Sequence, residues 1–140
     1  MIVLDTNVVS ELMRPRPNAA VTEWIARQPP QMLFTTWITM AEVFYGIALL
    51  PDGRRKAGLA ADVQRTFQED FRRRLLAFDA HAAVHYGEIL AVRRRGGTPM
   101  GILDAQIAAI ALAAGASVAT PNVDDFTGCG VAIINPWVTA

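Results

Sequence analysis

The chain opens on three consecutive branched apolar residues, Ile2-Val3-Leu4, which run directly into the carboxylate of Asp5. An unbroken apolar run of this kind is typical of a strand buried on both faces, as in a parallel sheet. Ligands of open α/β folds bind at the carboxyl edge of such strands. Two interpretations of Asp5 are therefore open: it caps the helix that follows, a role Thr6 could also fill, or it belongs to a functional site. Further acids in similar positions favour the second.

Apolar runs and helical spacing alternate along the rest of the chain. Strands are predicted at residues 2–4, 32–36, 75–78, 117–120 and 131–134, and helices at 6–13, 19–27, 54–70, 80–95 and 102–113. One more helix is predicted to begin at Thr36 or Thr39 and to run to Leu50. This alternation predicts one α/β domain over residues 1–140, with a mostly parallel five-stranded sheet flanked by helices.

Composition narrows the class of protein. Hydrophobic residues make up 52% of the chain, which is typical of a compact domain rather than a disordered one. Trp24 and Trp37 are expected in its core. No apolar run approaches the roughly 20 residues of a membrane span, and the amino end lacks the positive region of a signal peptide. Cys129 is the only cysteine. We therefore expect a cytoplasmic protein with no membrane contact.

Positive charge is unevenly distributed along the chain. The formal net charge is zero, which by itself argues against a nucleic-acid binder. Twelve of the thirteen basic residues are arginine, and clusters occur at residues 54–56, 72–74 and 93–95. Arginine is favoured for forked contacts to phosphate, whereas charge runs are commonly solvated helix faces. Both interpretations of these clusters, a solvated surface and an RNA-binding surface, remain open.

Three more acids resemble Asp5 in their position relative to the predicted strands. Glu42 is predicted in the first turn of the helix after the second strand, close to that strand's carboxyl end. Asp104 lies near the start of the helix at 102–113, which is apolar on nearly every side and must be buried. An ionised carboxylate there is costly unless a cation pairs with it. Asp125 follows the fourth strand, so all four carboxylates are expected at one edge of the sheet.

Carboxylates gathered in a partly buried cleft repel one another unless protons or cations compensate. Hard oxygen ligands without histidine or cysteine companions favour Mg²⁺, or Mn²⁺, over zinc. His81 and His85 are one helical turn apart but belong to a different segment, and we interpret them as structural. Acid-bound magnesium suits phosphoryl chemistry. The chain has no GxxxxGKS or GxxxxGKT, no GxGxxG after a strand and no GxSxG. A P-loop, a dinucleotide-binding motif and a serine nucleophile elbow are therefore excluded.

Five segments, in order and at matching spacing, carry a resemblance to a known family. They are residues 2–7 (IVLDTN), residues 39–46 (TMAEVFYG), residues 101–109 (GILDAQIAA), residues 119–126 (ATPNVDDF) and residues 134–137 (INPW). In these segments the chain resembles PIN-domain ribonucleases and, more narrowly, the VapC toxins of the FitB-like branch. Each segment alone is a weak signal, but five spread over essentially the whole chain are a strong one.

The resemblance implies a three-layer α/β/α fold and endoribonuclease activity that depends on Mg²⁺ or Mn²⁺. It also implies the role of toxin in a type II toxin–antitoxin module. Such toxins are homodimers that cleave tRNA, rRNA or mRNA, and a cognate antitoxin inhibits them by covering the active site. Carried over by position, Asp5, Glu42 and Asp104 match the metal-binding acids of the family.

The resemblance defines the fourth acid less well. Some members of the family have an acid at the position of Asn122, whereas many have asparagine there and an acid at the position of Asp125. We expect Asp125, rather than its neighbour Asp124, to complete the set, with Asn122 as a supporting hydrogen-bonding residue. Thr6 is expected to orient a metal-bound water through its hydroxyl.

One position departs from the pattern of the family, because many members have arginine where this chain has Pro121. A contact to RNA phosphate is then either missing or made by another arginine. Together with zero net charge, this departure supports an alternative function, a non-catalytic PIN-fold module that binds a protein partner or RNA. The complete acid set argues against that alternative, because unused carboxylates at a buried edge would destabilise the fold.

Overall fold

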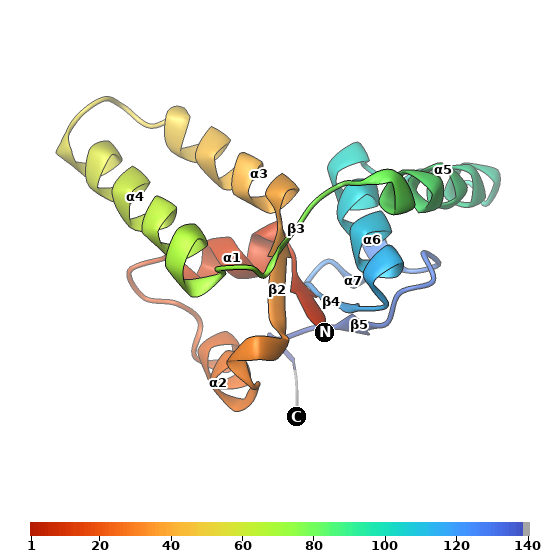
Figure 1. Ribbon diagram of the computed structural model, residues 1–140, viewed down its shortest axis with the longest axis horizontal. Coiled ribbons are helices and arrows are strands. Elements are labelled where there is room, and N and C mark those ends of the chain that lie inside the picture. The colour runs from red at the N-terminus through yellow and green to blue at the C-terminus, as the bar shows by residue number, and fades with distance from the viewer. Residues whose placement is uncertain (139–140) are drawn as a thin grey trace.

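The computed structural model of the chain describes residues 1–138 (Figure 1). Along the chain its elements are β1 (Ile2–Leu4), α1 (Thr6–Leu12), α2 (Ala19–Arg27), the 3₁₀ turn η1 (Pro30–Met32), β2 (Leu33–Thr36), α3 (Trp37–Ala48), α4 (Arg54–Arg65), the π-helical turn η2 (Thr66–Asp70), β3 (Leu75–Leu76), α5 (Ala80–Arg95), α6 (Ile102–Ala114), β4 (Ser117–Ala119), α7 (Val123–Phe126) and β5 (Ile133–Ile134).

The strands form one five-stranded sheet in the order β3-β2-β1-β4-β5, and every pairing in it is parallel. β1 lies in the centre, where Ile2 pairs with Leu33 of β2 on one side and with Ser117 of β4 on the other. Parallel strands require crossover connections, which the helices between successive strands provide. The predicted sheet is confirmed, and the carboxyl ends of all its strands lie at one edge.

Successive side chains of the central strands enter two different cores, because side chains alternate between the faces of a sheet. Val3 and Val118 belong to a core with α5 and α6, whereas Leu4 and Ala119 belong to a core with α1, α2, α3 and α4. Figure 1 shows these two sets of helices on opposite sides of the strands. Both faces of the sheet are covered, which confirms the three-layer α/β/α arrangement.

Several helix ends are set by single side chains. Asn18 accepts a hydrogen bond from the backbone N–H of Ala20 and starts α2, and Asp79 accepts one from Ala82 and starts α5. Gly115 ends α6 in the left-handed conformation, with a φ of 68°. These ends lie where the sequence predicts them.

Other elements differ from the predictions. The helix predicted over residues 54–70 is divided into α4 and η2, and the strands predicted at 75–78 and 131–134 are reduced to two residues each. The short helix α7 is not among the predicted helices. Strands at the ends of a parallel array have few pairing partners, and a four-residue helix is too short to show a period. Both kinds of difference are therefore tertiary in origin.

The two tryptophans expected in the core have different environments. Trp24 is buried, with 5% of its surface exposed, but the prediction for Trp37 is wrong because 49% of that residue is exposed. Trp37 is the first residue of α3 and lies just past the carboxyl end of β2, at the margin of the core. Within residues 1–138, no helix combines the length and the apolar character needed to cross a membrane.

Candidate active site at the carboxyl edge of the sheet

Asp5 caps α1, one of the two roles that its position suggests, and its side chain lies at the carboxyl edge of the sheet. It follows β1, where its backbone N–H donates to the carbonyl of Ala119 on β4 at 3.0 Å. Its Oδ1 accepts the backbone N–H of Val8 at 3.0 Å and so caps α1, while Oδ2 accepts from Asn7 Nδ2 at 3.3 Å. Only 1% of Asp5 is exposed. Burial raises the pKa of this carboxyl above its usual value, an effect that hydrogen bonds from Thr120 and other neighbours oppose.

Glu42 is held by a chain of threonine hydroxyls. Thr6 Oγ1 donates to Glu42 Oε1 at 2.8 Å. The Thr6 proton is committed to that bond, so at 3.2 Å Thr39 Oγ1 is the donor to Thr6 Oγ1. Thr36 Oγ1 in turn lies 3.4 Å from Thr39 Oγ1 and donates to it. The hydroxyl of Thr6 therefore orients Glu42, and its orienting a metal-bound water remains a prediction.

The position of Glu42 within its helix differs from the prediction. Thr36 caps α3 by accepting the backbone N–H of Thr39 at 3.0 Å, so the helix begins at Trp37. Glu42 consequently lies in the second turn of α3, and its prediction in the first turn is wrong. The extra turn brings Thr39 onto the same side as Glu42, where the hydroxyl chain forms.

Asp104 links the acids electrostatically. It is the third residue of α6 and is half-buried. Its pKa is raised to about 6, first by burial and then by the negative charges of Asp125, Asp5 and Glu42, in that order. Each of the other three acids predicted from the sequence therefore lies close enough to Asp104 for its charge to act on that carboxyl. Asp124, the alternative to Asp125, is exposed and is absent from these influences.

Asp125 reaches this edge because a buried arginine holds its backbone. Arg93, 8% exposed at the end of α5, donates from Nη1 to the carbonyls of Asp125 and Thr127 at 2.8 and 2.9 Å. Its Nε donates to the carbonyl of Thr98 at 2.7 Å. One guanidinium thus joins α5, the loop before α6 and the turn around α7, and it fixes the segment that carries the fourth acid.

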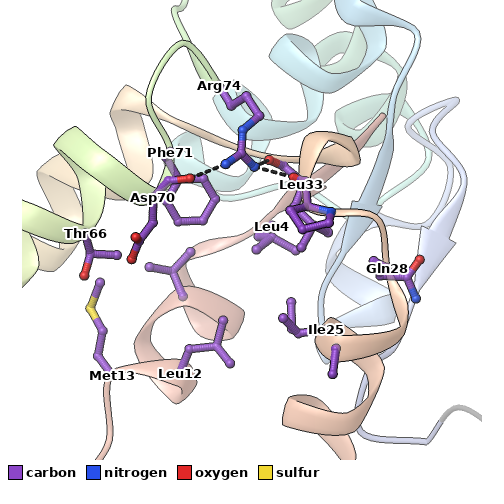
Figure 2. Close-up of a pocket in the computed structure, with 13 residues that line it drawn as sticks. Leu4, Leu12, Met13, Ile25, Gln28, Leu33, Thr66, Asp70, Phe71 and Arg74 are labelled. Atoms are coloured by element: carbon purple, nitrogen blue, oxygen red, sulfur yellow. Dashed lines mark hydrogen bonds between the residues drawn. The ribbon is translucent and has the colours of Figure 1, made fainter.

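Asn122 lies three residues before Asp125, at the start of α7, and its side chain is not held by a hydrogen bond within residues 1–138. Its backbone N–H donates to Thr120 Oγ1 at 3.0 Å, but among the described residues its side chain makes no hydrogen bond. Asn122, Asp124, Asp125 and Asn135 share a polar cavity of about 470 Å³ with Pro121 and Val123. The supporting role of Asn122 therefore stays a prediction. A second cavity of about 500 Å³, shown in Figure 2, holds none of the predicted site residues.

The donor chemistry of the four acids fits a hard divalent cation. Carboxylate oxygens are its preferred ligands, and the pKa of Asp104 is raised by burial and, after it, by the negative charges of three neighbouring acids. In the present arrangement, no three acidic, histidine or cysteine side chains of residues 1–138 are gathered closely enough to hold a metal ion. Binding would therefore draw together carboxylates that now repel one another. His81 and His85 lie on α5, and His81 lines a cavity with Ile110 and Ala113 of the carboxyl half of α6, whereas Asp104 lies at the amino end of α6.

Comparison with known proteins gives the family. The model of the PIN domain matches residues 2–127. The chain belongs to the PIN-domain family. This PIN domain is 44% identical over 137 residues to the plasmid stability protein StbB of Pseudomonas syringae pv. tomato, with 98% of this chain and 99% of the relative covered. It is 39% identical over 140 residues to the VapC ribonuclease Y4jK of Sinorhizobium fredii, with both chains covered completely.

Similarity to the FitB branch extends to solved structures. The PIN domain is 36% identical over 137 residues to the toxin FitB of Neisseria gonorrhoeae, with 98% of this chain and 99% of the relative covered. The FitAcB structure from that organism superposes with a TM-score of 0.92, at 36% identity and with 98% and 99% of the two chains covered. A FitAB structure bound to an IR36 DNA fragment gives 0.94, at 35% identity and with 100% and 98% covered. The resemblance seen in the sequence is confirmed.

Three residues of the site escape prediction from sequence. From the sequence, Thr36 and Thr39 are predicted only as alternative N-caps of one helix. Their spacing of three residues is nevertheless what allows the hydroxyl of Thr36 to reach that of Thr39. Arg93 reads as one of three equal arginines, because nothing in a charge run distinguishes a buried member from exposed ones.

Proposed function

We propose that this PIN domain is a metal-dependent endoribonuclease and the toxin of a type II toxin–antitoxin module. One observation carries the proposal: Asp104 lies at a partly buried edge within the electrostatic influence of three other acids, and burial first and then the charges of Asp125, Asp5 and Glu42 raise its pKa to about 6. Like charges gathered at a partly buried edge lower the stability of the metal-free fold. A bound cation would relieve that repulsion. Similarity to a protein named VapC ribonuclease supports RNA as the substrate.

The side chains of the chain itself have separable roles. Asp5 is held rigidly by the N–H of Val8, and Glu42 is oriented by the Thr6 hydroxyl. Asp104, half-exposed, and Asp125, exposed, border the side open to a substrate. Bound to these oxygens, Mg²⁺ or Mn²⁺ would activate a water and stabilise charge on the leaving oxygen. Neither His81 nor His85, both on α5, belongs to the acid set, and catalysis would rest on positioning and charge rather than on a histidine base.

The proposal includes two protein partners. A cognate antitoxin is supported by similarity to a relative named toxin FitB and to a FitAcB structure. A homodimer is supported by apolar side chains that α3 and α5 leave exposed, namely Tyr45, Leu49, Val84 and Val92, each more than half exposed. An RNA substrate would place the protein in the cytoplasm.

The test compares Asp104→Asn with the matched variant Asp124→Asn, which removes a similar charge outside the electrostatic set. Wild type and Asp124→Asn should cleave bacterial RNA in the presence of Mg²⁺ or Mn²⁺ and should bind Mn²⁺ in calorimetry. Asp104→Asn should fold, lose cleavage by at least about 100-fold and lose Mn²⁺ affinity. Full cleavage by folded Asp104→Asn would refute the assignment. RNA binding by the wild type without cleavage under either metal would favour the non-catalytic module.

A further inference from the structure

An exposed tryptophan stands at the edge of the sheet that carries the acids. Trp37 directly follows β2, as Asp5 directly follows β1, and 49% of it is exposed. The ring is not isolated, because it lines a groove together with Met40, Phe67 and Phe71, and apolar surface in a groove is typical of binding sites. Glu42 lies five residues further along the same helix. The ring is therefore available for binding near the candidate active site.

The groove beside Trp37 is basic. It measures about 290 Å³ and is lined by Trp37, Met40, Phe67, Gln68, Phe71, Arg72, Arg73 and Leu75. The lining includes two arginines and no acid. Both arginines are exposed, and within residues 1–138 neither guanidinium forms an ion pair or a hydrogen bond. Their charge is therefore free to meet an anionic ligand.

The third arginine of the same triplet fixes the turn that presents the other two. Arg74 Nη1 donates to the carbonyl of Leu33 at 2.6 Å, and the same guanidinium also bonds to the carbonyls of Pro30 and Asp70 (Figure 2). Its guanidinium carbon lies 5.7 Å from the centre of the Phe71 ring. Arg74 is thus an anchor, and it holds the turn against η1, β2 and η2.

The backbone of the turn is unusual at one of the exposed arginines. Arg73 has a φ of 62°, the one positive φ among the non-glycine residues that the structure describes. The left-handed region is unfavourable for residues with a Cβ, and such conformations cluster at functional sites. In the parallel register Thr36 pairs with Leu76, so Trp37 lies past one end of this strand pair and Arg73 before the other. The groove, which both residues line, accordingly extends along this strand pair from its amino end to its carboxyl end.

We propose that Trp37, Arg72 and Arg73 form a binding site for single-stranded RNA, in which a base stacks on the indole and the two guanidinium groups contact phosphates. The proposal rests on the proposed function, since it extends the same substrate beyond the acids. Stacking on an aromatic ring beside arginines is the general means of holding single strands without reading their sequence. Trp37 is the first residue of α3 and directly follows Thr36 of the hydroxyl chain, and helix amino ends attract phosphate. A strand held by the indole and continuing past this helix end would approach Glu42, which lies five residues further along α3.

RNA suits this groove better than a second protein chain does. The side chains that support a dimer, Tyr45 and Leu49, lie about 80° and 120° around α3 from Trp37, at about 100° per residue. They therefore face a different direction. A protein partner would also have to neutralise Arg72 and Arg73 with acids of its own, whereas RNA brings phosphates at regular intervals.

Binding is measured without cleavage, on the full chain in EDTA, with a ten-nucleotide oligoadenylate as the probe. Tryptophan fluorescence should be quenched in a saturable way in the wild type and should lose that response in Trp37→Phe. Affinity, measured by anisotropy of the labelled oligonucleotide, should fall roughly 5- to 150-fold in Trp37→Ala, and much less in Trp37→Phe, which keeps a π face. Thermal melting checks that each variant is folded.

Charge is tested by salt dependence. The double variant Arg72→Gln/Arg73→Gln should lower the slope of log affinity against log salt by about 1.4, because single strands release about 0.7 counterion per phosphate contact. Arg27→Gln, which removes an exposed charge at the end of α2, is the matched control and should leave the slope unchanged.

The outcomes separate this site from the proposed nuclease. Equal oligonucleotide affinity in wild type and folded Trp37→Ala would overturn the RNA site, and it would leave the nuclease standing if the wild type cleaves RNA with Mg²⁺. Binding that depends on Trp37 without any cleavage would uphold the RNA site and overturn the nuclease. A change in sedimentation of Trp37→Ala at unchanged RNA affinity would make the groove a protein interface and overturn the proposal.

Discussion

At the scale of single residues, Asp104 lowers the stability of the metal-free protein at neutral pH. Its pKa is raised from 3.8 to about 6 in the folded state. Between these values the folded protein holds a proton that the unfolded chain has released. The free energy of unfolding therefore falls as pH rises through this window and stays lower above it. This carboxyl stabilises the protein only when something cationic compensates it.

The first prediction follows from this fall in the free energy of unfolding with rising pH. In EDTA at pH 7.5, Asp104→Asn should be more stable than the wild type by up to about 1 kcal/mol, allowing for solvent screening of a half-exposed group. The advantage should vanish below about pH 4, where the wild-type carboxyl is protonated in both states. Urea denaturation at the two pH values measures it, with Asp124→Asn as the control. A less stable Asp104→Asn at pH 7.5 would contradict the electrostatic account.

Arg93 acts at the same scale through backbone carbonyls. Replacing it by methionine should reduce the free energy of unfolding by roughly 2–4 kcal/mol, since the carbonyls of Asp125, Thr127 and Thr98 lose a charged donor in a buried setting. Arg94→Met, its exposed neighbour on α5, should change stability little.

If Arg93 positions Asp125, millimolar guanidinium should partly restore Mn²⁺ affinity to Arg93→Ala. No restoration in a folded variant would leave Arg93 with a purely structural role.

At the scale of elements, the amino end of α3 couples helix capping to the site. Thr36 caps the helix, and the hydroxyl chain through Thr39 and Thr6 ends on Glu42. We expect Thr6→Val, which keeps the shape and removes the donor, to weaken Mn²⁺ binding about 10- to 100-fold, the range for residues that orient metal ligands. Thr22→Val on α2 removes a hydroxyl bonded to a carbonyl and should not affect it. Calorimetry on the folded variants decides.

Elements also show what the sequence predicts and what it leaves out. The bounds of α2 and the end of α6 could be predicted because Asn18 and Gly115 act locally. Asp5, Glu42 and Asp104 could be placed at one edge because parallel strands end together. The exposure of Trp37 could not be predicted, because it depends on where α3 begins relative to its neighbours. The separate roles of Arg73 and Arg74 within one triplet likewise depend on tertiary contacts.

At the scale of the whole molecule, the helices cover both faces of the sheet and leave apolar side chains on their outer surfaces. Tyr45 on α3 and Leu49, which caps the end of that helix, are 67% and 68% exposed, and Val84 and Val92 on α5 are 64% and 55% exposed. Tyr45 and Leu49 are four residues apart and therefore neighbours on the helix surface, and contiguous exposed apolar side chains are typical of protein interfaces. Since both faces of the sheet are covered, the exposed apolar side chains of the helices are the surface proposed for self-association.

The last prediction tests that surface. In sedimentation velocity at micromolar concentration the wild type should be a dimer, and Leu49→Glu should be a monomer, because an ionised carboxylate at an apolar interface is costly to bury. Met32→Glu introduces the same charge at an exposed apolar residue of η1, away from α3 and α5, and should remain dimeric. A dimeric Leu49→Glu would move the interface elsewhere. A monomeric wild type would assign these side chains to a different partner, such as the antitoxin.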